Sequence, residues 1–426
     1  MIKTLYKTKF RQDLLFSYMA QIVNIILGFL QVFLINKFLG VEIYGALMII
    51  VASAGMFSLL LDARSSESVT RFFTREFLLN NLSNAKFILF VGFIIDMVFA
   101  LLLVIIIYFF SDLIAKIFMK DSTLSFEVFL YAFVVFFTFL RGTILGYLQS
   151  LKMFTQINFM SMFELVLKNL LLIYMILTHE NNSLETILLI YICSSFLVYI
   201  YALIIFVKNF KKLFIGVTIC MNYEILKEYW HFNLKTFISS SLKAGNQNID
   251  TLLIAYFINA EMVGIYQVIK KILSPINFII KPFSMLVYPK LIKYFENKEV
   301  EKFKKLLFRI TSYILLVVVV YNIVIFIGIE YILNILNIHF LPEYNILLIL
   351  MFIISTVSST MWWARIFSNV VNPNYSLYMN LFATCYQLSV TIFLVYIFGL
   401  MGMLGSIIIM HCILLFYWIK KVEKYV

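Results

Sequence analysis

Charged side chains inside long apolar segments are the residues of this sequence most able to do chemistry. A cation held at the middle of a bilayer costs about 2.5–3.5 kcal/mol on insertion scales, so such charges mark a cavity, a partner or a ligand. The apolar segments hold seven cations and three acids, namely Arg141, Lys168, Lys243, Lys270, Lys271, Lys281, Arg365, Asp96, Glu164 and Asp250. These ten residues are the first candidates for a functional site.

Some of these charges have a partner in the sequence itself. Glu164 and Lys168 stand four residues apart on one helical face and can neutralise each other. Lys243 and Asp250 lie two turns apart on one face, where Asn246 can bridge them. About four cations of the same region are left without an acidic partner. Such a set favours an anionic ligand, for which phosphate is the natural candidate.

Other charges have a structural explanation as an alternative. Lys281 and Arg365 stand near the predicted cytoplasmic ends of their helices, where a long side chain can reach the membrane surface. Lys271 is adjacent to Lys270 and cannot share its face, so it is expected to point outward. Asp96 is the only charge on its segment, and it is either a satisfied packing group or an ion-coupling residue.

Uncharged polar residues continue the same helical faces. The stripes run through Ser17, Gln21, Asn24 and Gln31, through Asn158 and Ser161, through Thr236, Ser239 and Asn246, through Ser274, Asn277 and Ser284, and through Ser376, Asn380, Thr384, Gln387 and Thr391. Spacings of three, four and seven residues keep each stripe on one side of a helix. Lipid cannot satisfy these groups, so we expect the stripes to face one another or water.

Three of the five prolines fall on one segment at intervals of seven residues, as Pro275, Pro282 and Pro289. Proline removes a backbone hydrogen bond and kinks a helix. Pro275 and Pro282 therefore indicate either a hinge beside a cavity that opens alternately to the two sides of a membrane, or a static kink.

Residues for covalent chemistry are missing from the sequence. The four histidines are scattered, the four cysteines have no pairing or zinc spacing, and no phosphate-binding glycine loop occurs. The sequence therefore predicts no catalytic residues, no metal site and no cofactor, and it predicts that the chain does not hydrolyse ATP.

Composition places the polar faces in a membrane. Of the 426 residues, 63% are hydrophobic and only 13% charged, and the mean hydropathy is +0.97, which excludes a soluble protein. A bilayer core needs about 20 apolar residues per helix. Twelve continuous segments fit, at residues 14–36, 42–61, 87–109, 125–146, 156–177, 186–207, 233–257, 263–288, 306–327, 345–367, 375–397 and 402–419. The predicted fold class is all-α integral membrane.

Basic residues set the predicted orientation. With a cytoplasmic N-terminus, the inner loops and tails hold 23 Lys and Arg residues and the outer loops hold three, so both termini are expected inside. The net charge of +12 then faces the anionic inner leaflet, and no nucleic-acid partner is required. The stretch SSESVTRFFTREFLL in the loop at 62–86 fits either an amphipathic surface helix or a solvated connector. The predicted parts are a tail at 1–13, an N-lobe at 14–207, a linker at 208–232, a C-lobe at 233–419 and a tail at 420–426.

A repeat relates the two halves of the chain. At an offset of 219 residues, LINKFLGVEIYGALMII (34–50) and LIAYFINAEMVGIYQVI (253–269) share six of seventeen residues, including Glu42/Glu261 and Gly45/Gly264. Six spans separate the copies, so both have the same orientation, as in a parallel repeat. Each copy is expected at the outer turn between the first two helices of its half, where the glycines permit close packing.

The sequence resembles the oligosaccharide flippases of bacterial surface-polysaccharide synthesis (Wzx type), which belong to the multidrug/oligosaccharidyl-lipid/polysaccharide (MOP) exporter superfamily. The resemblance rests on FLINKFLGVEIYGALMIIVASAGMFSLLLD with Arg71 beyond it, and on NIDTLLIAYFINAEMVGIYQVIKKI with Tyr288 and Pro289 beyond it. The twelve-span layout matches over the full length. One departure is Asp62-Ala63-Arg64, where the family usually has a glycine two residues after the aspartate.

The resemblance implies two six-helix lobes around a central cavity, in a bacterial cytoplasmic membrane. The cargo would be an undecaprenyl-diphosphate-linked oligosaccharide repeat unit, moved to the outer leaflet by alternating access. Its diphosphate would meet Arg141, Lys168, Lys243, Lys270, Lys281 and Arg365, and its sugars Asn24, Gln31, Asn246, Asn380 and Gln387. Glu164, Asp250 or Asp96 would couple transport to H⁺ or Na⁺. A polysaccharide polymerase and a chain-length regulator would be its protein partners.

Two other functions stay open. The first is an ion-coupled multidrug antiporter of the same superfamily, which is disfavoured because cationic drugs need an acidic cavity and this set is cationic. The second is a polysaccharide polymerase-type membrane enzyme, which is disfavoured because every predicted outer loop is short.

Overall fold

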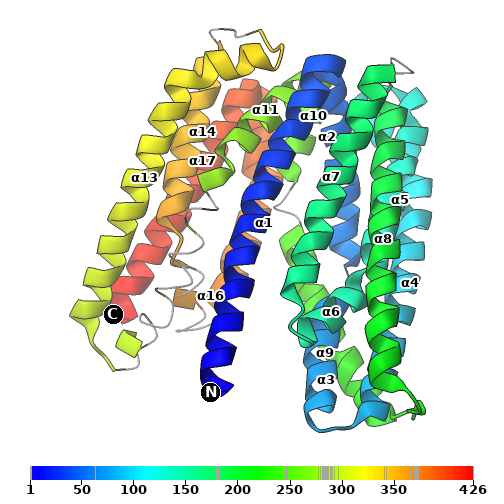
Figure 1. Cartoon of the computed structure of the whole chain (residues 1–426). Coiled ribbons are helices and arrows are strands. Elements are labelled where there is room, and N and C mark those ends of the chain that lie inside the picture. The colour runs from blue at the N-terminus through cyan, green and yellow to red at the C-terminus, as the bar shows by residue number, and fades with distance from the viewer. Residues whose placement is uncertain are drawn as a thin grey trace. The chain divides into compact units, whose positions relative to one another are not determined.

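The computed structural model describes the chain as residues 2–62, 64–178, 183–244, 248–276, 278, 280, 287, 291, 293–295, 297–339, 341, 343–364, 367–368 and 374–425. Every regular element in these ranges is a helix (Figure 1). Within the described ranges, eight helical stretches are long and apolar enough to cross a membrane. The predicted all-α membrane class is therefore confirmed.

The first six predicted spans each coincide with one of these stretches, namely Leu15–Leu39, Val41–Leu78, Leu82–Met119, Ser122–Ser150, Phe154–Thr178 and Leu184–Phe214. The other two are Val300–Ile335 and Tyr378–Glu423, and Tyr344–Thr360 is a shorter apolar helix. Gly399, at φ 56° and ψ −138°, breaks the helical geometry where the last two predicted spans meet. The count of twelve spans stays a prediction.

The seventh and eighth predicted spans differ from the structure. In place of one helix over 233–257, α9 (Tyr223–Ala244) is separate from α10 (Ile249–Phe257), and Asn248 before α10 is not helical. In place of one helix over 263–288, α11 (Ala260–Leu273) ends two residues before Pro275. A proline ring clashes with the carbonyl four residues before it, which accounts for that end.

The chain divides into two compact units. Unit 1 is Met1–Leu39 with Ile49–Ala244, and unit 2 is Gly40–Met48 with Gly245–Val426. Unlike the predicted lobes, this division crosses α2 (Val41–Leu61) and places α9 in unit 1. Two bonds hold α9 there: an ion pair of 2.7 Å between Arg75 Nη1 and Glu228 Oε2, and a hydrogen bond of 3.1 Å from Asn233 Nδ2 to Ser68 Oγ.

Long antiparallel helices make up unit 1. They are α1 (Ile2–Leu39), the C-terminal part of α2, α3 (Ser65–Leu78), α4 (Leu82–Ile114), α5 (Ser125–Leu140), α6 (Gly142–Ser150), α7 (Phe154–Thr178), α8 (Leu184–Phe214) and α9. Helices α4, α5 and α8 run side by side in Figure 1, with α7 against α8. Asp96 lies on α4, and Glu164 and Lys168 lie on α7.

Helix α3 occupies the loop that the sequence left as a helix or a connector. Val69, Phe72 and Phe73 are buried on one face of α3 and belong to the unit 1 core together with Tyr147. The rings of Phe73 and Tyr147 meet edge to face at 5.3 Å between centroids. The helical alternative is thus confirmed, and the apolar face of the helix packs into protein.

The turn before α3 explains the departure from the family pattern. Arg64 has φ 50° and ψ 34°, the left-handed conformation that favours glycine. Its backbone N–H donates to Asp62 Oδ1 at 2.9 Å, and its side chain pairs with Asp62 and Glu67. The arginine therefore adopts the glycine conformation and does not reroute the chain.

We expect Arg64→Gly to keep or raise the melting temperature of the purified protein, because a left-handed conformation costs about 1–2 kcal/mol for a residue with a Cβ. The ion pairs lost with it are partly exposed and contribute about 0–1 kcal/mol. Arg64→Val should lower the melting temperature, since a β-branched residue is most strained at positive φ. Equal melting temperatures for the two variants would refute this account of the turn.

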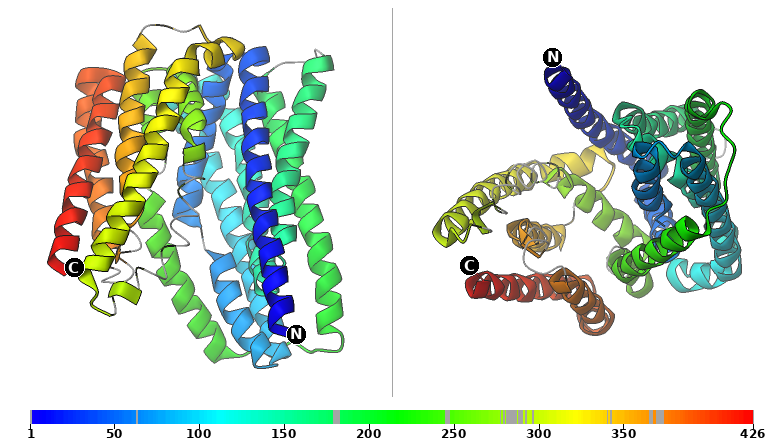
Figure 2. Two further views of the ribbon diagram at one scale, coloured as in Figure 1. Left: turned by 60° about the vertical axis from the view of Figure 1, so that its left-hand side comes forward. Right: turned by 90° about the horizontal axis from the view of Figure 1, so that it is seen from below.

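Unit 2 holds the remaining described helices. They are the N-terminal part of α2, then α10, α11, α13 (Val300–Ile335), α14 (Glu343–Thr360), α16 (Asn374–Tyr386) and α17 (Ile392–Tyr425). A π-helical segment, Gln387–Thr391, joins α16 to α17. Helices α13, α14 and α17, coloured from yellow to red in Figure 2, lie side by side, with α14 between the other two.

The part of the first repeat copy that lies in unit 2, residues 40–48, packs directly against the second copy. A Cβ added to Gly45 would overlap the carbonyl of Ala260 and lie 3.0 Å from the backbone nitrogen of Gly264. A Cβ added to Gly264 would overlap the carbonyl of Val41 in the same way. The predicted close packing at these glycines is confirmed, with each copy serving as the partner of the other.

The turn that precedes each crossing helix is also equivalent. Gly40, at φ +97°, separates α1 from α2, and Asn259 at the matching position caps α11 by accepting from Met262 N at 2.9 Å. Glu42 and Glu261 then stand in the first turns of α2 and α11, where a carboxylate is favoured by the helix dipole. The repeat thus encodes a turn, a helix start and a crossing point.

Candidate functional site

Unit 1 contains a buried ion network between the α5–α6 break and α7, beside α8. Glu164 accepts from Arg141 Nη1 at 2.8 Å through Oε2 and from Lys168 Nζ at 2.8 Å through Oε1. The side chains of Arg141 and Lys168 are each 11% exposed. Lys168 Nζ also lies 4.6 Å from the centre of the Tyr191 ring. Two cations share one carboxylate, so the network keeps one net positive charge.

Arg141 occupies the break between α5 and α6. Its Nη2 donates to Thr138 Oγ1 at 3.2 Å, while its Nε is buried without a hydrogen-bond partner among the described residues. A guanidinium has five donors in a planar fork suited to carboxylate and phosphate oxygens. A free donor beside a surplus positive charge is the feature of unit 1 that best fits an anionic ligand.

The polar stripe of α1 is bonded to α7 and α8. Asn24 Nδ2 donates to Ser161 Oγ at 3.0 Å, and Gln31 Nε2 donates to the Tyr191 hydroxyl at 2.7 Å. Asn158 Nδ2 donates to Ser17 Oγ at 2.7 Å. The expectation that stripes face one another is confirmed here. The side-chain oxygen of Asn24 is buried and has no hydrogen-bond partner among the described residues.

The cations have more acidic partners than the sequence indicated. Arg141 and Lys270 lay outside the two predicted pairs, yet Arg141 bonds Glu164 and Lys270 bonds Asp250. This is a difference between the predicted and the observed pairing. Its cause is that both pairs form between different helices, where sequence spacing carries no information.

Asp96 on α4 is a buried carboxylate at the start of α6. Its Oδ2 accepts from the backbone nitrogen of Thr143 at 2.7 Å. A Cβ added to Gly142 would lie 2.9 Å from Asp96 Oδ1, so the carboxylate reaches the helix end because residue 142 is glycine. The first N–H groups of a helix lack intrahelical partners, and a carboxylate there is favoured by the helix dipole. The contacts of Asp96 fit the first of its two predicted roles, that of a satisfied packing group, because its carboxylate caps the N-terminus of α6.

We expect Asp96→Leu to lower the stability of the purified protein by about 1–3 kcal/mol, because it leaves the Thr143 N–H buried without an acceptor. Asp96→Asn keeps an oxygen acceptor and should cost less. Thermal unfolding in detergent measures the stability, and transport in vesicles measures the activity. An Asp96→Asn protein that is stable yet inactive would instead assign ion coupling to Asp96.

Unit 2 contains a second polar cluster where α10 meets α11. Asp250 Oδ2 accepts from Lys270 Nζ and from the Tyr266 hydroxyl, each at 2.5 Å, and Asp250 Oδ1 accepts from Thr251 N at 2.8 Å. The Asp250 side chain is 13% exposed, whereas that of Lys270 is 42% exposed. One carboxylate and one ammonium balance each other, so this cluster is neutral overall.

The cluster borders a cavity of about 540 Å³ lined wholly by unit 2. Its polar lining comes from the cluster and from α14, the π-helical segment and α17, namely Asp250, Tyr266, Lys270, Ser274, Ser355, Ser358, Ser359, Gln387 and His411. The Gln387 side-chain oxygen is buried without a hydrogen-bond partner among the described residues. The polar part of the cavity wall therefore consists of hydroxyl and amide groups beside a neutral ion pair.

Sequence reasoning found part of this cavity. It singled out Asp250, Lys270 and Gln387, but it passed over the α14 serines and dismissed His411 as isolated. A signal existed for the serines, because Ser355, Ser358 and Ser359 recur at helical spacing in an apolar segment. No sequence signal pointed to His411. Its Nδ1 lies 2.8 Å from the carbonyl oxygen of Ile407, one turn earlier on the same helix.

Several predicted positions lie outside the described residues or outside the cavity. The structure does not describe Lys281, Arg365, Asn246, Pro282 or the side chain of Lys243, so the predicted bridge from Lys243 to Asp250 falls outside the described part. Asn380 is partly buried on α16 and is not among the cavity-lining residues. Pro275 follows the end of α11, and a hinge there remains a prediction.

Comparison with known proteins identifies the kind of molecule. The sequence profile of the family described as polysaccharide biosynthesis protein matches residues 10–295. No curated protein sequence gives a significant match. Among solved structures, an inward-facing multidrug resistance MATE family transporter of the MOP superfamily is 13% identical with a TM-score of 0.71, over 94% of this chain and 95% of that one.

Two further structures share the fold. The lipid II flippase MurJ in an inward closed conformation is 14% identical with a TM-score of 0.69, over 96% of this chain and 87% of that one. The Vibrio cholerae MATE transporter VcmN in its bent form is 11% identical with a TM-score of 0.56, over 96% and 98%. At these identities the likeness establishes the fold and leaves the ligand open.

Proposed function

Because the chain belongs to the polysaccharide biosynthesis protein family of the MOP exporter superfamily, a family of multi-pass membrane transporters, we propose that it flips lipid-linked oligosaccharide repeat units. The proposed cargo is an undecaprenyl-diphosphate-linked glycan, carried from the cytoplasmic to the outer leaflet of a bacterial cytoplasmic membrane for surface-polysaccharide synthesis. Both termini are cytoplasmic in this proposal, the chain has no catalytic residues or cofactor, and its path opens alternately to the two sides.

The buried network of Arg141, Glu164 and Lys168 carries the proposal. Among the described residues it keeps one surplus positive charge and one guanidinium N–H without a partner in an apolar helix bundle, and burying such a surplus is costly unless an anion offsets it. A diphosphate supplies that anion. A cationic drug would be repelled by the same network, which counts against the multidrug antiporter.

The unit 2 cavity supports a glycan cargo. Sugars present many hydroxyl groups, and the serine hydroxyl oxygens and the Gln387 side-chain oxygen on the cavity wall are acceptors for them. The pairing of Asp250 with Lys270 removes the free acid that a cationic ligand would need. The proposal assigns the diphosphate to the unit 1 cations and the sugars to amide and hydroxyl groups.

Ion coupling is the second part of the proposal. Glu164 and Asp250 each bind a cationic side chain, so a proton or Na⁺ at either acid would compete with that side chain. Release of Arg141 or Lys270 on ion binding would change the charge offered to the diphosphate. A flipping rate that is unaffected when the H⁺ and Na⁺ gradients are collapsed would rule this part out.

Deletion of the gene tests the function in cells, with surface polymer and lipid-linked glycans measured together by mass spectrometry. The proposal expects complete repeat units to accumulate on the lipid while the polymer is lost. Single units that still reach the surface would indicate a polymerase. Unchanged glycans would contradict the proposal and direct attention to drug efflux.

Co-purification with a polymerase and a chain-length regulator would test the proposed partners.

A further inference from the structure

The serines on the wall of the unit 2 cavity have already used their hydrogen-bond donors. Each of the four described serines donates its hydroxyl hydrogen to the backbone carbonyl three residues earlier, at 2.7–3.1 Å. These serines are Ser274, Ser355, Ser358 and Ser359. A hydroxyl bonded in this way offers a ligand only the lone pairs of its oxygen.

The ring donors of the wall are also in use. The Tyr266 hydroxyl donates to Asp250 Oδ2, and Trp362 Nε1 donates to Thr311 Oγ1 at 3.0 Å. His411 Nδ1 lies 2.8 Å from a backbone carbonyl oxygen of its own helix. Because a carbonyl oxygen can only accept, Nδ1 carries the hydrogen, and Nε2 of the neutral ring is left as an acceptor.

Gln387 adds a buried acceptor that has no partner. The residue is 7% exposed, and its side-chain oxygen lacks a hydrogen-bond partner among the described residues. Gln387 opens the π-helical segment Gln387–Thr391, a type of turn frequently found at functional sites. Thr391 Oγ1 lies 2.6 Å from Ser406 Oγ, and this bond fixes the segment to α17. A ligand hydrogen directed at Gln387 would satisfy an acceptor that is costly to leave unpaired.

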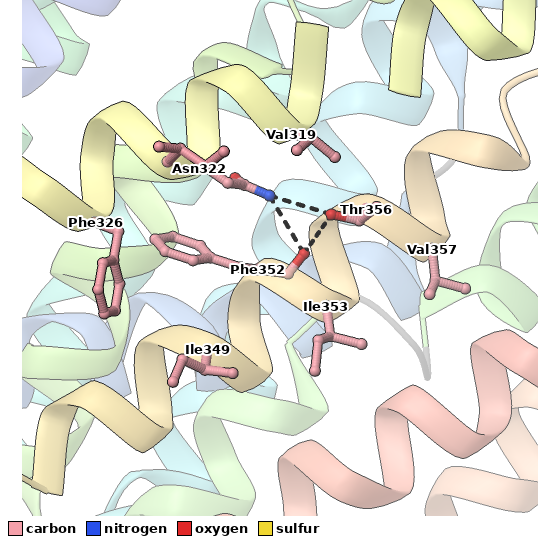
Figure 3. Close-up of a pocket in the computed structure, with 9 residues that line it drawn as sticks. Val319, Asn322, Phe326, Ile349, Phe352, Ile353, Thr356 and Val357 are labelled. Atoms are coloured by element: carbon pink, nitrogen blue, oxygen red, sulfur yellow. Dashed lines mark hydrogen bonds between the residues drawn. The ribbon is translucent and has the colours of Figure 1, made fainter. Parts of the chain in front are cut away.

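Few donors remain for a ligand on the described wall. Lys270 is 42% exposed, but its Nζ is already bonded to Asp250. Asn322 on α13 is bonded to α14, because its Nδ2 donates to Ser355 Oγ at 3.0 Å and to Thr356 Oγ1 at 3.2 Å, the second of which is drawn in Figure 3. The Gln387 amide nitrogen and the other hydrogens of Lys270 are left. The described wall is therefore rich in acceptors and has no net charge.

We infer that this cavity binds one sugar unit through the hydrogens of its hydroxyl groups, and that it selects neutral, hydroxyl-rich sugars over acidic ones. The inference rests on the proposed function and adds the class of sugar to it. A sugar hydroxyl can turn its hydrogen toward an acceptor of the wall, such as Gln387 Oε1 or His411 Nε2. Several such bonds would hold the ring without any charge on the ligand.

The same wall disfavours charged ligands of either sign. A carboxylate has no hydrogen to donate, so it would lose its water against a wall of acceptors, and burial of an unpaired charge is costly. The ammonium of Lys270 does not offset that cost, because Asp250 already binds it. A cationic ligand would meet acceptors, but the ion pair leaves no net negative charge to balance it.

Flipping of two matched probes tests the selectivity. The full-length protein is placed in phospholipid vesicles with undecaprenyl diphosphate that carries either one glucose or one glucuronic acid. The two sugars differ only in the carboxylate that replaces the hydroxymethyl group at C6. We expect the glucose probe to flip at least ten times faster. Equal rates, or a faster glucuronic acid probe, would overturn the inference.

Gln387→Leu tests whether the preference arises in the cavity. Leucine replaces a buried acceptor that has no described partner, so the variant should melt near the wild-type temperature. Its flipping rate should fall about tenfold for the glucose probe and change less than about twofold for the glucuronic acid probe. An unchanged preference would show that another part of the protein rejects the carboxylate, and would overturn the inference.

Ser389→Ala is the matched control. Ser389 lies on the same π-helical segment but not on the cavity wall, and its hydroxyl donates to the Cys385 carbonyl at 2.7 Å, like the cavity serines. Both flipping rates should stay at the wild-type value in this variant. A loss of preference in Ser389→Ala as large as in Gln387→Leu would contradict a specific role for Gln387.

Equilibrium binding of the two probes to the purified protein separates this inference from the proposed function. Probes that bind with the expected preference but are not flipped would refute the proposed function alone. Probes that are flipped at equal rates and bound equally tightly would refute the inference alone. Probes that are neither bound nor flipped would refute both.

Discussion

Glu164→Gln should be the most destabilising single substitution in unit 1. It leaves Arg141 and Lys168 without a counterion, and removal of one partner from a buried ion pair costs about 3–5 kcal/mol. We expect a steep fall in the melting temperature of the purified protein and in its amount in membranes. The matched variant is Lys116→Met, which breaks the exposed Lys116–Asp112 pair and should change stability by less than about 1 kcal/mol.

The triple variant Arg141→Met, Glu164→Gln, Lys168→Met separates stability from function. Replacing a buried ion network by apolar groups is often neutral or stabilising, so this protein should melt near the wild-type temperature. It should nevertheless flip lipid-linked oligosaccharide at least 100-fold more slowly, because no cation is left there for the diphosphate. A triple variant that is both stable and active would show that the network has only a structural role.

Gly45→Ala should have the second largest effect, and it acts through packing alone. The new methyl group would overlap the backbone carbonyl of Ala260, and backbone cannot move aside as a flexible side chain can. The helices α2 and α11 would have to separate. We therefore expect Gly45→Ala and Gly264→Ala each to lower both the melting temperature and the transport rate. Each decrease should be at least severalfold larger than the decrease caused by an ordinary surface substitution.

Gly405→Ala is the control for both glycines. Gly405 is also helical, but a Cβ there would meet nothing within 4 Å. In the absence of a clash, alanine in a helix is favoured over glycine by about 0.5–1 kcal/mol, so Gly405→Ala should be neutral or stabilising. If all three variants behave alike, the close crossing of the two repeat copies is not important for stability.

Much of the fold was predictable from the sequence, because each membrane-crossing helix is encoded by one continuous apolar segment. The repeat was informative for the same reason: Gly45 and Gly264 match in sequence and meet in space. The seventh and eighth segments were less predictable. The non-helical Asn248 and the helix end at Leu273 depend on local geometry that hydropathy does not register.

The candidate site was predictable by residue type but not by partner. Charges in apolar segments singled out Arg141, Glu164 and Lys168, but the spacing did not indicate the bond between Arg141 and Glu164, which lie 23 positions apart. The same holds for Asp250 and Lys270, which are 20 positions apart. Helical periodicity predicts contacts within one helix, whereas contacts between helices depend on how the helices are rotated and packed.

Flipping by the purified protein tests the central claim most directly. Undecaprenyl-diphosphate-linked oligosaccharide is built into vesicles with the wild-type chain, the triple neutral variant or no protein, and a glycosidase added outside reports which glycans reach the outer leaflet. The proposal expects the inner pool to become cleavable only in wild-type vesicles. Equal protection of that pool in all three preparations, together with accumulation of a cationic dye by the wild-type protein, would contradict the flippase and establish a drug transporter.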